Sequence, residues 1–283
     1  MKKIGLIYNA TRSSNLDFAK KIGEYLSGKG ITTCIYKTGV PDSDLVHLSE
    51  SLDFALILGG DGTLLGTSRV LAPKNIPMFG VNTGHLGFLT EGRPGNVHEL
   101  LDKVLAGEYR VEERAMLEAQ ISSSDKSMIA LNDIVIYRAV DKRMLHLTLS
   151  VNERPVADYH SDGLIISTPT GSTAYAMAAG GAVMDPEVRG IEIVPMCAHS
   201  LTNRPHIVSD TKELTITFNR AHQGTILQMD GQENYPIKTG ESIKVKKSKI
   251  NAKLIRLLGE ESDFYWTIRQ KFHWGSLAVQ DIT

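Results

Sequence analysis

The sequence predicts an α/β N-terminal domain with a parallel sheet, followed by a β-rich C-terminal domain. Strand-like and helix-like segments alternate through the first 108 residues, an order that builds parallel sheets with right-handed crossovers. From residue 109 to 259 short strand-like segments dominate. A length of 283 residues corresponds to two domains of ordinary size. We therefore expect domains at residues 1–108 and 109–259, with residues 260–283 packing back on the first.

Hydrophobic periodicity predicts the elements of the first domain. Residues 54–58, with the sequence FALIL, are continuously apolar, as in a strand covered on both faces. Shorter β-favouring runs predict further strands at residues 3–8, 32–36 and 76–81. Helices are expected where apolar residues recur every three or four positions, at residues 16–26, 63–71 and 97–105.

The second domain shows the alternation of half-buried strands. Apolar and polar residues alternate with a period of two at residues 148–151, 214–218 and 243–246. One helix is expected among these strands, from about residue 172 to 179, because small residues follow a turn there. A last helix is expected at residues 263–274.

Composition limits the partners and the compartment. Lys and Arg number 31 and Asp and Glu 32, so the net charge of −1 gives no overall field that attracts nucleic acid or anionic lipid. No stretch approaches the roughly 18 apolar residues of a membrane-spanning helix. Cys34 and Cys197 form no CxxC pair, which is typical of two reduced, buried thiols. We expect a soluble, cytoplasmic protein that binds neither nucleic acid nor membranes.

A glycine-rich loop carries the clearest chemical signal. Residues 59–63, Gly-Gly-Asp-Gly-Thr, directly follow the expected strand at 54–58. Glycines let backbone N–H groups converge on an anion, and the following helix start adds its dipole. Asp61 in such a loop would hold Mg²⁺ or accept the proton of an attacking hydroxyl. The alternative is a tight turn in which Asp61 caps the helix. Leu65 occupies a position where the dinucleotide-binding fingerprint requires glycine, which excludes that motif.

A second signal is the segment 162–175, in which a β-run leads to Pro-Thr-Gly-Ser-Thr and then to a small-residue helix. Hydroxyls and N–H groups at a helix start suit ribose, adenine edges or phosphate. Tyr175 could stack on a base. The alternative is an ordinary helix cap with Tyr175 packed in the core.

Two weaker signals accompany these. Residues 80–89 form a second glycine-containing loop at the end of an expected strand, where ligands bind open α/β sheets. His85 in this loop is more typical of a loop hydrogen bond than of a catalyst. Asn132 and Asp133 are polar within the apolar run 129–136, which indicates either an edge bulge or a ligand contact.

In this order the four motifs resemble the NAD kinase family, whose pattern has a GGDGT loop, an NTGxLGFL loop, an Asn-acidic pair and an SDGLxxxTPTGSTAY segment. They stand here at residues 59–63, 82–89, 132–133 and 161–175. The resemblance implies transfer of a phosphoryl group to the 2′-hydroxyl of the adenosine ribose of NAD. It implies ATP or polyphosphate as the donor, a divalent cation such as Mg²⁺, and a homo-oligomer, either a dimer or a tetramer.

The resemblance also implies roles for single residues. Asp61 would be the general base with Gly62 beside it at the ribose, and Gly59, Gly60 and Thr63 would complete the phosphate loop. The implied NAD contacts are Asn132, Asp133, Arg143, His160, Asp162, Thr173, Ala174, Tyr175, Ala176, Met177, Ala178 and Gln232. The metal ligands stay open.

Two alternatives remain at this point. A lipid or sphingoid kinase shares the GGDGT loop, but it should carry an apolar or basic membrane-binding face, and the sequence shows none. A non-catalytic nucleotide sensor could keep the pocket, although the intact Asp61 argues against it. The choice between ATP and polyphosphate, and between NAD and NADH, is also open.

Overall fold

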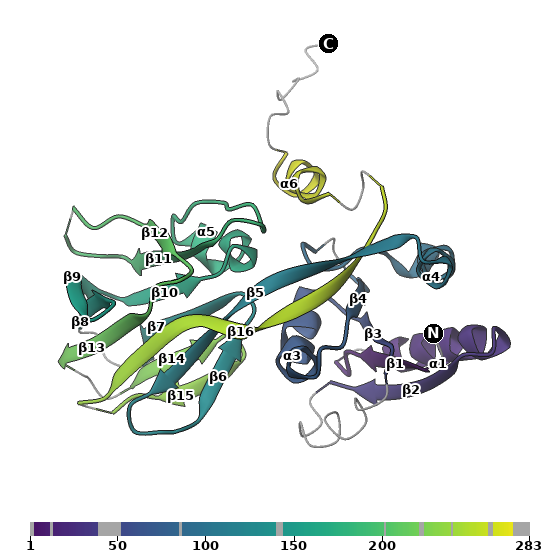
Figure 1. Ribbon diagram of the computed structural model, residues 1–283, viewed down its shortest axis with the longest axis horizontal. Coiled ribbons are helices and arrows are strands. Elements are labelled where there is room, and N and C mark those ends of the chain that lie inside the picture. The colour runs from purple at the N-terminus through teal and green to yellow at the C-terminus, as the bar shows by residue number, and fades with distance from the viewer. Residues whose placement is uncertain are drawn as a thin grey trace, which may run out of the picture. The chain divides into compact units, whose positions relative to one another are not determined.

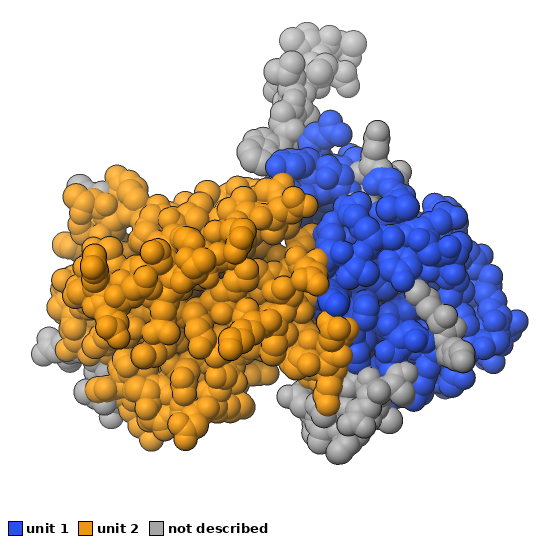
Figure 2. All heavy atoms as spheres, in the orientation of Figure 1, with its two compact units in different colours: residues 1–67, 76–112, 253–283 blue, residues 68–75, 113–252 orange. Residues whose placement is uncertain are grey.

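A computed structural model describes most of the chain as two compact units. Unit 1 comprises residues 1–67, 76–112 and 253–283, and unit 2 comprises residues 68–75 and 113–252 (Figure 2). The residues described are 3–11, 14–38, 52–84, 87–139, 144–200, 202–220, 224–238, 240–259 and 263–273. Within these ranges no helix is long and apolar enough to cross a membrane.

Parallel strands form the sheet of unit 1 (Figure 1). β1 (Lys3–Tyr8) lies between β2 (Thr32–Lys37) and β3 (Phe54–Leu58), and β3 pairs with β4 (Met78–Val81). The end of β16 (Ser242–Leu257) extends this sheet in parallel beside β4. The parallel sheet confirms the α/β class predicted for the N-terminal part of the chain.

Helices cover both faces of that sheet. α1 (Ser14–Gly28) and α4 (Val97–Ala106) bury their apolar stripes against one face. Two residues separate β3 from α3 (Asp61–Leu71), whose Leu64 packs at Gly80 on the opposite face of the sheet. Among the described residues, η3 (Pro94–Asn96) and α6 (Phe264–Phe272) also belong to unit 1, while η2 (Ala72–Lys74) belongs to unit 2.

Unit 2 contains two antiparallel layers, which confirms the predicted β-rich class (Figure 1). In one layer β13 pairs with β16 and β8, β8 with β9, and β5 with β6. The other layer has the order β12-β11-β10-β7-β14-β15. The bounds of these strands are β5 (Tyr109–Ile121), β6 (Ser127–Ala130), β7 (Asp133–Arg138), β8 (Leu145–Val151), β9 (Arg154–Ser161), β10 (Gly163–Ser167), β11 (Gly190–Met196), β12 (His206–Ser209), β13 (Leu214–Arg220), β14 (Thr225–Met229) and β15 (Glu233–Pro236).

The core of unit 2 lies between the two layers, and strand alternation decides which side chains enter it. Ile134 and Ile136 of β7 join the buried cluster shared by both sheets. Val135 points to the other face of the same strand, where it packs with Ile165 and Ala176. The segment around Ala176 therefore rests on the outer face of the second layer.

Short strands dominate unit 2 as predicted, and the long exceptions among the described strands are β5 with 13 residues and β16 with 16. Two other predictions about unit 2 were wrong in detail. The expected helix at 172–179 is instead a 3₁₀ turn, η4 (Thr170–Thr173), and a four-residue helix, α5 (Tyr175–Ala178). Ala174 separates them with a ψ of −126°, because tertiary contacts of the turn override the helical propensity of its alanines.

The second difference concerns the apolar run at 129–136. It is split between β6 and β7, which belong to different layers, and a turn at Leu131 and Asn132 separates the two strands. Of the two cysteines, Cys34 is half-buried and Cys197 is exposed, so the expectation of two buried thiols was wrong.

Candidate active site

The glycine-rich loop joins β3 to α3 in a tight turn. The Gly59 N–H donates to the carbonyl of Val81 at 3.0 Å, which ties the loop to the end of the neighbouring strand. A Cβ at Gly59 would lie 2.3 Å from Thr63 Oγ1, so only glycine fits there. The same Oγ1 accepts a hydrogen bond from Asn9 Nδ2 at 3.2 Å. Three strand ends thus meet at this loop.

Asp61 is held by the loop that follows β4. Its Oδ2 accepts from the Phe88 N–H at 2.7 Å, and its Oδ1 accepts from the Leu89 N–H at 3.1 Å. A Cβ at Gly87 would lie 2.0 Å from Oδ1, so the close approach also requires glycine. Asp61 is the first residue of α3, and its carboxylate accepts hydrogen bonds from the loop after β4. The alternative in which Asp61 serves as a helix cap is therefore wrong.

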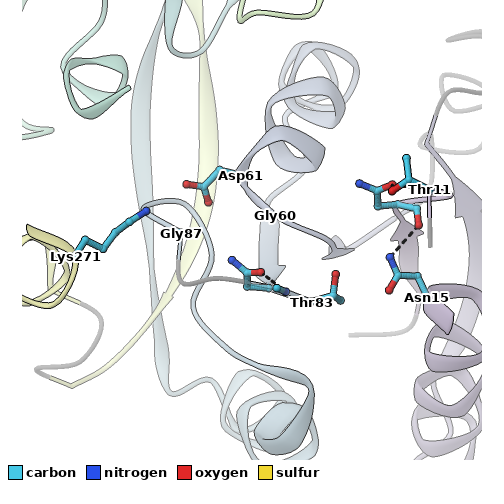
Figure 3. A pocket seen from close by; sticks show the side chains of 10 residues that line it. Thr11, Asn15, Gly60, Asp61, Thr83, Gly87 and Lys271 are labelled. Carbon is cyan, nitrogen blue, oxygen red and sulfur yellow. Dashed lines mark hydrogen bonds between the residues drawn. The ribbon is translucent and has the colours of Figure 1, made fainter. Parts of the chain in front are cut away.

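A polar cavity of about 390 Å³ opens at these loops, entirely within unit 1 (Figure 3). Amide, hydroxyl and glycine positions dominate its wall, which suits phosphate groups. Its lining residues are Asn9, Thr11, Asn15, Gly60, Asp61, Asn82, Thr83, Gly84, Gly87 and Lys271. Gly59, Gly62 and Thr63 flank this wall in the loop, while His85 of the second loop lies outside the described residues.

A buried arginine supports the loop that receives Asp61. Arg256 Nη2 donates to the Phe88 carbonyl at 2.8 Å, and Nη1 lies 2.5 Å from Glu91 Oε1. Its Nε lies 3.4 Å from Glu112 Oε2. Sequence reasoning missed Arg256. The only signal was a single charge inside the otherwise apolar segment 254–257.

In unit 2 a buried aspartate organises the turn between β6 and β7. Asp230 accepts from the N–H groups of Leu131 at 3.0 Å, Asn132 at 2.7 Å and Asp133 at 3.2 Å. Its own φ is +50°, a strained left-handed value for a non-glycine residue. Arg69 Nη1 lies 3.3 Å from its Oδ2. The turn at 131–133 is therefore fixed by one carboxylate.

Two carboxyl groups in this turn have raised pKa values. Burial raises the pKa of Asp133 to about 7, and the nearby charge of Asp230 adds to the shift. Burial also raises the pKa of Asp230, although the three N–H groups and Arg69 oppose the change. At neutral pH Asp133 is present in both protonation states, so it can donate a hydrogen bond as well as accept one.

The expected nucleoside-binding segment packs on the backbone of Asn132. The Thr168 N–H donates to the Asn132 carbonyl at 2.9 Å, and a Cβ at Gly171 would lie 2.1 Å from that carbonyl oxygen. Asn132 Oδ1 is buried and has no hydrogen-bond partner among the described residues. A buried acceptor without a partner is a candidate ligand contact.

The end of this segment faces solvent. Tyr175 is 45% exposed, so the alternative that packs it in the core is wrong. Ala176 is buried and anchors the segment to the sheet. The other expected contacts here are half-buried or exposed, namely Thr173, Ala174, Met177 and Ala178.

The remaining expected contacts lie on other elements of unit 2. Asp162 Oδ1 accepts from Arg138 Nη2 at 2.6 Å. The His160 ring stacks on His146 with 4.0 Å between centroids. Gln232 Oε1 accepts from Arg69 Nη2 at 2.8 Å. Arg143 lies outside the described residues.

Two arginines on these elements escaped sequence reasoning. Arg138 pairs with Asp162, and its Nη1 is buried without a partner in the described part of the chain. Arg69 contacts both Asp230 and Gln232. Neither arginine lies in a glycine-rich or polar motif, so nothing local marked them.

No metal centre is evident from side chains alone. Across the residues that the structure describes, no group of three or more His, Cys, Asp or Glu side chains could hold a metal ion. Asp61 is the carboxylate on the cavity wall.

A carboxylate in a glycine-rich loop on the wall of a polar cavity defines a small-molecule phosphotransferase. Two family models match the chain. The ATP-NAD kinase N-terminal domain matches residues 41–109, and the ATP-NAD kinase C-terminal domain matches residues 131–257. An NAD kinase of Heliobacterium modesticaldum is 36% identical over 284 residues, which are 97% of this chain and 100% of that protein. The chain therefore belongs to the NAD kinase family.

Solved structures share the fold. An NAD kinase from Archaeoglobus fulgidus in complex with ATP aligns with a TM-score of 0.77 and 26% identity, over 94% of this chain and 98% of that one. Yeast NADH kinase complexed with NADH aligns with a TM-score of 0.84 over 98% of this chain and 89% of that one. Its identity of 22% shows the fold alone.

Proposed function

We propose that this member of the NAD kinase family transfers a phosphoryl group to the 2′-hydroxyl of the adenosine ribose of NAD, which gives NADP. The observation that carries the proposal is the position of Asp61. Its carboxylate is fixed by two backbone N–H groups and lines a polar cavity at a glycine-rich loop. Phosphoryl transfer needs a positioned hydroxyl, a proton acceptor and charge neutralisation, and little covalent chemistry from the protein.

In this mechanism Asp61 accepts the proton of the ribose hydroxyl while the hydroxyl oxygen attacks the terminal phosphorus of the donor. Gly60 lines the cavity directly before α3, and open space at its Cβ position lets the donor phosphates approach the backbone at the positive end of the helix dipole. Gly59 supports this loop through its hydrogen bond to Val81. Gly62 and Thr63 complete the loop. A positioned base of this kind contributes typically about 10²–10⁴-fold to the rate.

The nucleoside of NAD would be bound by the polar turn and by the segment after β10. Asn132 Oδ1 is an acceptor suited to an N–H or hydroxyl donor, and Asp133 can serve a ribose hydroxyl in either protonation state. The exposed ring of Tyr175 is available to stack on a base. Asp162, His160, Gln232 and the residues 173–178 complete the proposed contacts.

ATP is the proposed donor, because the Archaeoglobus fulgidus relative was solved in complex with ATP. A divalent ion, Mg²⁺ in the first instance, is proposed with it. Mg²⁺ is usually bound by one or two carboxylates together with substrate phosphates, and Asp61 on the cavity wall is the carboxylate that would hold it beside them. When bound, the ion neutralises charge on the phosphates.

The test is to incubate the pure protein with NAD, Mg²⁺ and either ATP or polyphosphate, and to measure NADP with an NADP-specific assay. We expect NADP with at least one donor and none after chelation of the metal. Sphingosine and diacylglycerol presented in vesicles test the lipid-kinase alternative in parallel. A metal-loaded protein that binds NAD but makes no NADP with either donor would support the nucleotide-sensor alternative.

A homo-oligomer, either a dimer or a tetramer, is proposed as well. Among the described strands, β9 and β12 each end a path of paired strands, and open edges call for pairing or cover. Val156 on β9 is 59% exposed and Ile207 on β12 is 49% exposed. Light scattering that finds a monomer at working concentration would contradict the proposal. The cytoplasmic location stays a prediction.

A further inference from the structure

We propose that Lys271 is a catalytic residue that binds the terminal phosphates of the phosphoryl donor. The inference rests on the proposed function and adds a residue to the same site. Lys271 lies on α6, far in sequence from the glycine-rich loop, yet it lines the same cavity as Gly60 and Asp61 (Figure 3). No motif in the sequence pointed to it.

Phe88 positions Lys271 and Asp61 together. The Phe88 N–H donates to Asp61 Oδ2 at 2.7 Å. The ring of the same residue lies 4.4 Å from Lys271 Nζ, measured to the ring centroid. The face of an aromatic ring attracts a cation electrostatically. One residue therefore fixes the base through its backbone and the ammonium group through its side chain.

The helix that carries Lys271 is anchored at the same point. The ring of Phe272 lies 5.5 Å from that of Phe88, and the ring of Phe264 lies 6.4 Å from it. The N-terminus of α6 is capped by Asp263, whose side chain accepts from the N–H groups of Tyr265 and Trp266. The backbone at Lys271 is thus held at both ends of the helix.

The charges in the cavity call for a cation of this kind. Among the described residues that line it, Asp61 and Lys271 are the charged ones, and the ion pairs found between described residues do not include Lys271. An ATP triphosphate brings several negative charges toward the carboxylate of Asp61. A lysine is a compact cation with three donors, well suited to phosphate oxygens.

The transfer step is balanced with Lys271 in this role. The bond between the terminal phosphorus and the bridging oxygen of ATP breaks, and a bond from that phosphorus to the ribose 2′-oxygen forms. The hydroxyl proton passes to Asp61, and ADP leaves with the electron pair of the broken bond. Lys271 takes no part in the proton transfer, and its ammonium group offsets the negative charge on the donor oxygens.

The test compares Lys271→Met and Lys271→Arg with a matched control on the same helix, Arg269→Met. Arg269 is an exposed cation of α6 outside the cavity. We expect Lys271→Met to lower kcat/KM for ATP by about 10²-fold, as for loss of one transition-state donor. KM for NAD and the melting temperature should stay close to wild type. Lys271→Arg should recover part of the loss, and Arg269→Met should behave as wild type.

Three outcomes would overturn the inference: an unchanged kcat/KM for ATP in Lys271→Met, an equal loss in Arg269→Met, or a loss confined to KM for NAD.

Binding of a non-hydrolysable ATP analogue, measured by calorimetry, separates this inference from the proposed function. If the wild-type protein makes no NADP, the proposed function fails. Weaker binding of the analogue to Lys271→Met would still support the phosphate contact, and equal binding would reject it.

Discussion

Arg256 and Glu91 form a buried ion pair in unit 1, with 2.5 Å between Nη1 and Oε1 and side chains that are only 6% and 3% exposed. The same guanidinium donates to the carbonyl of Phe88, whose N–H donates to Asp61. A buried charge that loses its partner is costly because nothing replaces its hydration. The pair therefore links the stability of the unit to the position of the proposed base.

Replacing Arg256 with Met should lower the free energy of unfolding by about 3–5 kcal/mol, because the change removes one partner of a buried ion pair. Urea denaturation measures this change. The control is Lys103→Met, since both side chains of its ion pair with Glu99 are exposed, 41% and 67%, and its loss should leave stability close to wild type. Equal losses in the two variants would show that burial of the pair does not matter.

Sequence reasoning found the glycine-rich loop but not the pair that supports it. The FALIL run and the loop are local patterns, and both are read from a few neighbouring residues. Arg256 and Glu91 are 165 residues apart, and neither has a local signature. Lys271 was missed for the same reason. Contacts between residues far apart in the chain leave no local pattern in the sequence, so only the folded structure reveals them.

The Asp61→Asn variant should lose most of its turnover, by about 10²–10⁴-fold, because an amide cannot accept the hydroxyl proton. It should also lose a little stability. Asn has a single acceptor oxygen, while Phe88 and Leu89 both donate to the carboxylate, so one buried donor would lose its partner. The measurement is kcat, NAD affinity and melting temperature on one preparation. Near-normal kcat would reject the role as base.

His160 is predicted to help choose between NAD and NADH. His160 lies two residues before Asp162, whose carboxylate pairs with Arg138. The exposed ring of His160 packs against that of His146. Removing the ring in His160→Gly should change the ratio of kcat/KM for the two dinucleotides. The control is His146→Ala, which removes only the stacking partner. A ratio that is unchanged in His160→Gly would remove His160 from the proposed contacts.

In unit 2 the sequence indicated the polar pair at 132–133 but not how it is held. The pair looked like an interruption within one strand, because the apolar residues on both sides suggested continuity. The structure ends one strand and starts another there, since Asp230 accepts three N–H groups from the turn. Only the partner about a hundred residues away distinguishes a strand break from a bulge.

Gly171→Ala should disrupt the turn that precedes the proposed nucleoside-binding residues 173–178. The new Cβ would lie 2.1 Å from the carbonyl oxygen of Asn132, and rigid backbone cannot relieve the clash cheaply. We expect a loss of at least about 1–3 kcal/mol of stability together with weaker NAD binding. The matched control is Gly28→Ala, where the Cβ meets nothing within 4 Å. If both variants bind NAD as the wild type does, the close packing of Gly171 on the Asn132 carbonyl has no role in NAD binding.

Asp133 should make stability fall as the pH rises from about 4 to about 7. The unfolded carboxyl ionises near pH 4, while burial and the charge of Asp230 raise its pKa to about 7 in the folded chain. Below pH 4 both states hold the proton, and the contribution of the neutral carboxyl to stability is fully present. Between the two values the unfolded state ionises first, so unfolding becomes easier until the folded pKa is passed.

The full shift corresponds to about 4 kcal/mol, and Asp133→Asn should remove this part of the pH dependence, because an amide does not ionise. Urea denaturation of both proteins at several pH values from 4 to 8 measures the difference. Glu192, whose pKa burial also raises, remains unchanged in both proteins. Asp230 also remains, but its charge is coupled to that of Asp133, so the difference between the two proteins reports the ionisation of Asp133 together with this coupling. Parallel stability profiles would show that its carboxyl ionises in the folded chain much as it does in the unfolded one.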